Sequence, residues 1–158
     1  MIQLFTELQE KKNVRSNLSA LRASLKEATE EQKAQAIEFV RGHEDLVFGF
    51  LQEEDAKTRK NAALLLGDLA VQNALQPLWK AYTREQTLFV KSAYLEAMKA
   101  LHAEEILSQL KDRLAELEGE PVTEENRKHW EAELRALRAI LLQYEGIDTH
   151  HFDIKQKN

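Results

Sequence analysis

The sequence repeats its own pattern of apolar residues at an offset of 32 positions, and this repeat limits the possible folds more than any other feature. At this offset Leu66 matches Met98, and in the next stretch Leu78 matches Leu110. Apolar positions that match in both helices of a pair are typical of stacked helical repeats. Each unit cannot cover its apolar face alone, so neighbouring units bury it against one another. The sequence therefore predicts an all-α protein, an α-solenoid of stacked antiparallel helix pairs in a right-handed superhelix.

Composition agrees with helices and bounds the number of domains. The 158 residues fit one domain, and a chain of roughly this length buries about 68–70% of its unfolded surface. Hydrophobic residues make up 43% and charged residues 31%, while only five glycines and two prolines interrupt the chain. We expect one helical repeat domain over residues 1–146, followed by residues 147–158 as a tail or a linker to a further domain.

The residue types exclude several classes of protein. Without cysteine the chain cannot form disulfides or thiolate metal sites, and this suits a reducing compartment, so we expect a cytoplasmic protein. No apolar run approaches the roughly 20 residues of a membrane span, so no membrane partner is expected. The net charge of −5 argues against a protein that coats nucleic acid indiscriminately, although it leaves local basic patches possible.

Capping residues predict five helix starts, two of them at Thr87 and Thr123. Thr29 with Gln32, and Asn73 with Gln76, have the spacing of a capping box, in which two side chains satisfy backbone N–H groups reciprocally. Asp55 is the expected cap of the central helix, whose apolar residues lie on more than one face. Such a helix is sandwiched between neighbours.

Residues 55–69 resemble the second helix of a HEAT repeat, and the HEAT-like pattern covers about residues 42–117. The residues that carry the resemblance are Asp55, Arg59, Ala62, Ala63, Leu66, Gly67 and Leu69. The period of 32 is shorter than the roughly 40–47 residues of HEAT repeats. The next repeat also departs from the pattern, with Thr87 in place of the aspartate and Lys99 in place of the glycine.

A second resemblance covers nearly the whole chain. The segments 5–10, 14–18, 55–63 and 144–146 are similar to the amino-terminal helical-repeat region of bacterial putative S-adenosylmethionine-dependent RNA methyltransferases. This resemblance implies an accessory domain that helps to select or hold an RNA substrate or a ribosomal partner. The chain itself has no Gly-rich turn for the cofactor and no acidic-Pro-Pro-aromatic motif, so we expect it to be non-catalytic and without a cofactor.

Basic residues are concentrated in the expected second helices. Residues 11–26 hold five basic side chains and no acidic one. Second helices line the concave face of a HEAT stack, so a positive strip there could hold phosphates. The predicted RNA- or phosphate-binding strip is Arg15, Arg22, Arg59, Lys60 and Lys91. For Arg59 an alternative is a structural ion pair with Asp55 or with the next repeat.

Other candidate chemistry is weaker. His150 and His151 lie near two aspartates in the tail, where a polar linker is more common than a metal site, so no metal is predicted. Four aromatic residues could stack on bases, but their spacing favours the core. They are Trp79, Trp130, Tyr82 and Tyr94. An enzyme with a HEAT-like fold is the least favoured class, because no general acid–base arrangement is recognisable.

The sequence therefore leaves two hypotheses for function. The first is a non-catalytic accessory domain of an RNA methyltransferase-like protein, which binds RNA or a ribosomal partner. The alternative is a protein–protein interaction scaffold with no nucleic-acid role. Binding to RNA that weakens steeply with salt would separate them.

Overall fold

A computed structural model describes residues 1–144 of the chain. These residues contain nine α-helices, three short 3-10 helices and no strand. In chain order the elements are α1 (Ile2–Gln9), α2 (Val14–Lys26), α3 (Glu30–Gly42), α4 (Glu44–Gly49), η1 (Phe50–Gln52), α5 (Ala56–Asp68), η2 (Gln72–Ala74), α6 (Leu75–Arg84), α7 (Leu88–Ala100), η3 (Ala103–Ile106), α8 (Leu107–Gly119) and α9 (Arg127–Leu142). The predicted all-α class is confirmed for this part of the chain. The predicted tail or linker over residues 147–158 lies outside it.

The 32-residue offset reappears in the bounds of the helices. The α5 and α7 helices are both 13 residues long and begin 32 residues apart, at Ala56 and Leu88. The α6 and α8 helices begin at Leu75 and Leu107, which have the same offset. A short 3-10 helix comes directly before each of these two helices. The repeat in the sequence therefore corresponds to a repeat in local structure.

Two of the predicted helix caps are confirmed. The Thr29 hydroxyl accepts a hydrogen bond from the backbone N–H of Gln32, and the Gln32 side chain accepts one from the backbone N–H of Thr29. The Asp55 carboxylate accepts the backbone N–H of Thr58 at 2.9 Å, at the start of α5. In both cases the donors are N–H groups that lack a partner within the helix.

The predicted cap Thr87 makes no side-chain hydrogen bond at the start of α7, and α9 begins at Arg127 and not directly after Thr123. The predicted capping box of Asn73 and Gln76 is also wrong. Asn73 belongs to η2, and α6 then begins at Leu75 without a side-chain cap. The Asn73 amide instead donates to the Glu44 carboxylate of α4 at 3.2 Å. A tertiary contact with a charged acceptor has therefore replaced the local hydrogen bond that the sequence spacing suggested.

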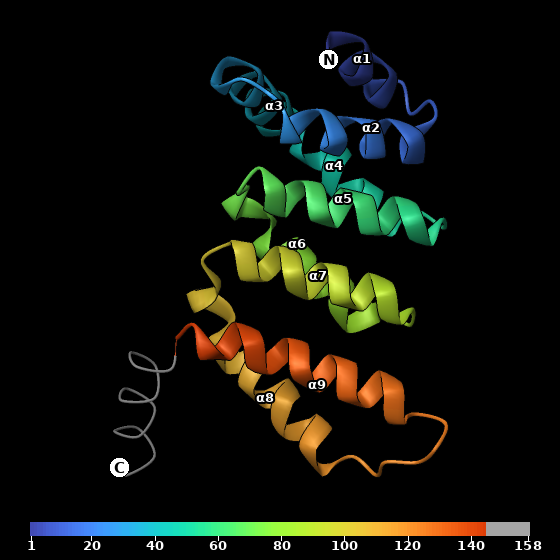
Figure 1. The fold of residues 1–158 in the computed structure, drawn as a ribbon, viewed down its shortest axis with the longest axis vertical. Coiled ribbons are helices and arrows are strands. Elements are labelled where there is room, and N and C mark those ends of the chain that lie inside the picture. The colour runs from blue at the N-terminus through green and yellow to red at the C-terminus, as the bar shows by residue number, and fades with distance from the viewer. Residues whose placement is uncertain (145–158) are drawn as a thin grey trace. The chain divides into compact units, whose positions relative to one another are not determined.

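The chain divides into two compact units, which are Met1–Leu101 and the residues from His102 on. In the first unit α5 lies between α2 and α7, and these three helices run roughly parallel (Figure 1). The α1 helix packs on α2, η1 packs on α5, and α6 packs on α7. In the second unit α8 packs along α9. The single repeat domain over residues 1–146 stays a prediction.

The α5 helix is the most deeply buried element of the first unit. Its fully buried side chains include Ala62, Ala63, Leu65 and Leu66. At Gly67 it approaches α7 so closely that an added Cβ atom would lie 2.9 Å from the Cα atom of Ala97. A residue without a side chain is therefore needed here, because backbone atoms of α7 cannot move aside as a flexible side chain could.

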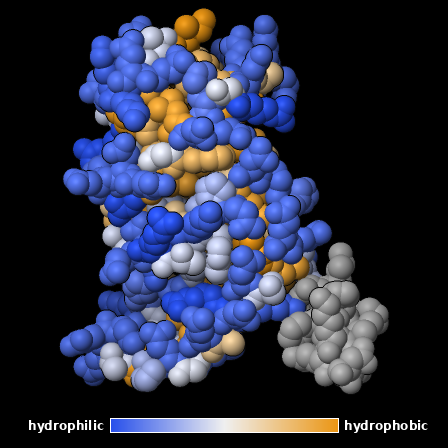
Figure 2. All heavy atoms as spheres, turned by 180° about the vertical axis from the view of Figure 1, so that it is seen from behind, coloured by the Kyte–Doolittle hydropathy of each residue, from blue (hydrophilic) through white to orange (hydrophobic). Residues whose placement is uncertain are grey.

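Hydrophilic residues cover most of the face seen in Figure 2, with hydrophobic residues showing between them. In the described part of the chain, the large hydrophobic side chains that are exposed are Ile2, Phe89, Val122 and Leu142. Exposed apolar residues that occur singly are normal on protein surfaces. Within residues 1–144, no helix combines the length and the apolar character that a membrane span requires.

Candidate functional site

Basic residues of α2 form ion pairs with both ends of α5. Arg15 Nη1 lies 3.3 Å from Asp55 Oδ1, and Arg22 Nε donates to Asp68 Oδ2 at 2.7 Å. Asp55 caps α5 and Asp68 is its last residue, so the two pairs tie α2 to α5 along its whole length. The first pair is about half exposed, and such pairs contribute little to stability. Two cations of the predicted strip therefore face carboxylates in the folded chain.

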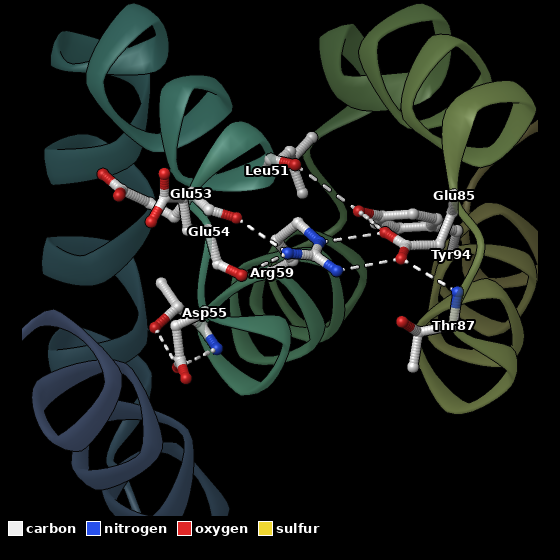
Figure 3. Close-up of polar contacts among 9 residues, drawn as sticks. Leu51, Glu53, Glu54, Asp55, Arg59, Glu85, Thr87 and Tyr94 are labelled. Atoms are coloured by element: carbon white, nitrogen blue, oxygen red, sulfur yellow. Dashed lines mark hydrogen bonds and ion pairs between the residues drawn. The ribbon is translucent and has the colours of Figure 1, made fainter.

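Arg59 lies at the centre of a denser network of hydrogen bonds (Figure 3). Its Nε and Nη2 atoms donate to the two carboxylate oxygens of Glu85 at 2.9 Å each. Its Nη1 atom donates to the backbone carbonyls of Glu53 and Glu54 at 2.8 Å each. A planar guanidinium fits a carboxylate in this two-bond arrangement. Arg59 thus pairs with the segment before α7, in the next repeat, and Asp55 is occupied by other donors.

The Glu85 carboxylate accepts hydrogen bonds from three residues, and its side chain is only 5% exposed. Besides Arg59, it accepts the backbone N–H of Thr87 at 3.2 Å and the hydroxyl of Tyr94 at 3.1 Å. Burial by itself raises the pKa of Glu85, but these hydrogen bonds outweigh it and hold that pKa below its ordinary value. The hydrogen bonds with Glu85 raise the pKa of Arg59, and burial, together with the charge of Glu85, raises the pKa of Tyr94. Arg59 and Glu85 are therefore both charged at neutral pH.

The two lysines of the predicted strip have different surroundings. Lys60 is half-buried on α5 and makes no hydrogen bond or ion pair with the described residues. Lys91 lies on α7, with its Nζ atom 5.9 Å from the centre of the Tyr82 ring. None of these contacts tests phosphate binding, so the role of Arg15, Arg22, Arg59, Lys60 and Lys91 in RNA recognition stays a prediction.

A groove of about 610 Å³ lies beside Arg59, next to η1 and α6. Its lining combines apolar, acidic and basic side chains. They include Leu51, Pro77 and Tyr94, then Glu53 and Glu54, and then Lys80 and Arg84. A groove with this mixture can hold an extended segment that carries charges of both signs.

Histidine and acidic residues do not gather into a metal site in the part of the chain that the structure describes. His43 has a structural role instead, because its ring stacks on Phe39 and its Nε2 atom lies 2.7 Å from the Gln9 side chain. It thereby connects α1 with the end of α3. The pair His150 and His151 lies outside the described residues.

Glu85 was not predicted from the sequence as the partner of Arg59. A signal was present, because Glu53 matches Glu85 at the 32-residue offset, directly before the second helix of each repeat. Tyr94, which the sequence allowed as a base-stacking residue, is fully buried and its hydroxyl reaches Glu85. Its ring therefore belongs to the core, as the helical spacing favoured.

No protein-family model, curated protein or solved structure matches this chain.

Proposed function

We propose that this chain is a non-catalytic binding module, built as a right-handed solenoid of HEAT-like helix pairs. The proposal places it in the cytoplasm beside a methyltransferase domain, where it helps to select or hold an RNA substrate or a ribosomal partner. The solenoid is supported by α2, α5 and α7, which have the same length of 13 residues and run roughly parallel. The link to a methyltransferase is supported by the resemblance of the sequence segments described above.

The observation that carries RNA binding is the uneven charge of the segment that contains α2. Residues 11–26 have five cations and no anion, and Arg15 remains 55% exposed although it pairs with Asp55. An exposed guanidinium in a weak ion pair can exchange its carboxylate for a phosphate at little cost. Lys60, which has no ion-pair partner among the described residues, adds a cation on the neighbouring helix. Together these residues give RNA phosphates a basic surface across α2 and α5.

The test is RNA binding at several salt concentrations, with variants chosen to leave the fold intact. The strip variant combines Arg15→Gln with Lys60→Gln. Arg59 is left unchanged, because its loss would break the network with Glu85. The control variant combines Lys80→Gln with Lys99→Gln, which removes two exposed cations from α6 and α7.

We expect the strip variant to reduce the slope of log affinity against log salt by about 0.7 for each cation removed, because each phosphate contact releases counterions. The control variant should keep the slope of the wild type. Equal losses in the two variants would show that the strip is an ordinary solvated surface.

A protein–protein interaction scaffold is the second candidate, and one observation favours it. Three of the five strip cations, Arg15, Arg22 and Arg59, already pair with carboxylates, which reduces the positive potential that RNA would meet. The groove beside Arg59 would then be the place for a peptide segment. If the wild-type chain binds no RNA even at low salt, the result would favour the protein–protein scaffold over the RNA-binding module.

A further inference from the structure

A second cavity, of about 410 Å³, lies where α2, α3 and the end of α5 meet. Its lining residues come from separate parts of the first unit and fall into two kinds. The charged ones are Arg22, Lys26, Lys33 and Asp68, and the apolar ones are Leu25, Ile37, Leu69 and Ala70. The volume lies within the roughly 300–1,000 Å³ of pockets that hold small molecules.

The charges of this cavity do not cancel. Three cations face it and Asp68 is the single anion in its lining, so the lining carries an excess of two positive charges. Asp68 pairs with Arg22 Nε at 2.7 Å, and this contact orients a guanidinium whose side chain is only 25% exposed. Within residues 1–144 the two terminal nitrogens of Arg22 have no hydrogen-bond partner. A guanidinium held in this way has lost part of its conformational freedom before any ligand arrives.

The two lysines of the cavity are available for a ligand. Lys26 makes no hydrogen bond or ion pair with the described residues. Lys33 Nζ lies 3.8 Å from Glu30, whose side chain is 96% exposed, and a pair of this length at the surface is weak. An anion with several oxygens could therefore be reached by both lysines and by Arg22, as phosphate groups are in many proteins.

The apolar residues of the cavity suit a ligand that is more than a bare anion. Leu25 and Leu69 are largely buried but reach the cavity wall, and the half-buried Ile37 adds apolar surface beside the cations. Base and ribose rings can contact such surface while the phosphate stays near the charges. A purely inorganic anion would leave this surface in contact with water.

We propose that this cavity binds a nucleotide through its phosphate monoester. The phosphate lies among Arg22, Lys26 and Lys33, and the organic part lies against Leu25 and Leu69. The site shares Arg22 with the predicted strip but does not include Arg15 or Lys60, so the variant Arg15→Gln, Lys60→Gln tests RNA binding without changing the cavity.

The experiment is calorimetric titration of the whole chain with AMP and with adenosine at low salt. We expect AMP to bind more tightly than adenosine, and its affinity to fall as salt is added, because the phosphate supplies the charge. The double variant Lys26→Gln, Lys33→Gln should weaken AMP binding about tenfold, since two exposed contacts to an anion are removed. The matched variant Lys80→Gln, Lys99→Gln should bind AMP as the wild type does.

Three results would overturn the proposal. They are no AMP binding at millimolar concentration, equal binding of AMP and adenosine, and equal losses in the two double variants. Substitution of the two exposed lysines does not touch the ion pair of Arg22 with Asp68, and an unchanged melting temperature will show that the fold persists. The source of the phosphate is identified by the affinity for a short RNA with a 5′-phosphate, compared with that for the same RNA with a 5′-hydroxyl. Preference for the phosphorylated RNA indicates an RNA end, and indifference combined with AMP binding indicates a free nucleotide.

Discussion

Each of the two units contains an Arg–Glu pair with two hydrogen bonds, in which the glutamate side chain is buried and the arginine is partly exposed. In the first unit Arg59 holds Glu85, whose side chain is 5% exposed. In the second unit Arg113 holds Glu133, whose side chain is 1% exposed, at 3.0 and 3.2 Å. The two pairs therefore have nearly the same chemistry and burial, and they differ in what surrounds them.

The two arginines also make further contacts, and the contacts described next differ in kind. Arg59 donates to two backbone carbonyls before α5, so its pair fixes the path of the chain between helices. Arg113 donates to the exposed side chain of Glu116, and His129 lies 3.7 Å from Glu133. The second pair thus connects the surfaces of α8 and α9 through side chains. We therefore expect the pair of Arg59, which also anchors backbone, to be harder to replace than the pair of Arg113.

The largest expected effect comes from removing Glu85. Glu85→Ala leaves the charge of Arg59 buried without its carboxylate, and it removes the acceptor of Thr87 and Tyr94. We expect a loss of about 3–5 kcal/mol in the free energy of unfolding, measured by urea denaturation. Glu54→Ala is the control, because Arg59 uses only the backbone carbonyl of Glu54. A loss of similar size in the control would contradict this account of the network.

Glu133→Ala is expected to cost less, about 1–3 kcal/mol. Arg113 keeps the Glu116 carboxylate at 3.3 Å, and Glu116 is exposed enough for water to reach that end of the guanidinium. The same urea measurement applies. If Glu133→Ala destabilised the chain as much as Glu85→Ala, then the backbone contacts of Arg59 would not distinguish the two pairs.

Gly67→Ala tests how tightly α5 and α7 pack against each other. An added methyl group would meet backbone atoms of Ala97, so we expect a loss of about 1–3 kcal/mol in thermal or urea unfolding. Gly49→Ala is the matched control, because nothing lies within 4 Å of its added Cβ atom. Since alanine favours helices, the control should be neutral or more stable by up to about 1 kcal/mol. Equal effects in the two variants would mean that the close approach at Gly67 is unimportant.

Tyr94→Phe removes the hydroxyl that donates a hydrogen bond to Glu85 and leaves the aromatic ring in place. We expect a loss of about 1 kcal/mol in the free energy of unfolding, because Glu85 keeps Arg59 and the Thr87 N–H as donors. The double variant with Glu85→Ala should lose less than the sum of the two single variants, since the lost bond is shared. Additive losses would show that the Tyr94 hydroxyl does not act through Glu85.

Acid should weaken the ion pair between Arg59 and Glu85. The folded pKa of Glu85 lies below its ordinary value of 4.5, so folding favours the charged carboxylate. Its contribution is complete above about pH 4.5 and is lost as the pH falls through the lower folded pKa. Melting temperatures between pH 7 and pH 3 should therefore decline less steeply in Glu85→Gln than in the wild type. Parallel curves would mean that other carboxylates account for the loss of stability in acid.

The sequence by itself determined the features that depend on neighbouring residues along the chain. It predicted the helical class, the 32-residue repeat, the cap at Asp55 and the capping box of Thr29 with Gln32. It also predicted the multi-faced burial of α5, where Leu66 is fully covered. These predictions succeed because helix periodicity and capping are set by residues within four positions of one another.

Only the tertiary structure decided which distant residues meet. It paired Arg59 with Glu85, gave Asn73 a partner on α4, and brought Lys33 of α3 to the cavity of Arg22. It also explains why Gly67 needs to be a glycine while its repeat match Lys99 is exposed. An apolar pattern tells which face of a helix is buried, but it does not tell which neighbour covers that face. Partners that lie 20 or more residues apart therefore appear only once the helices are placed against one another.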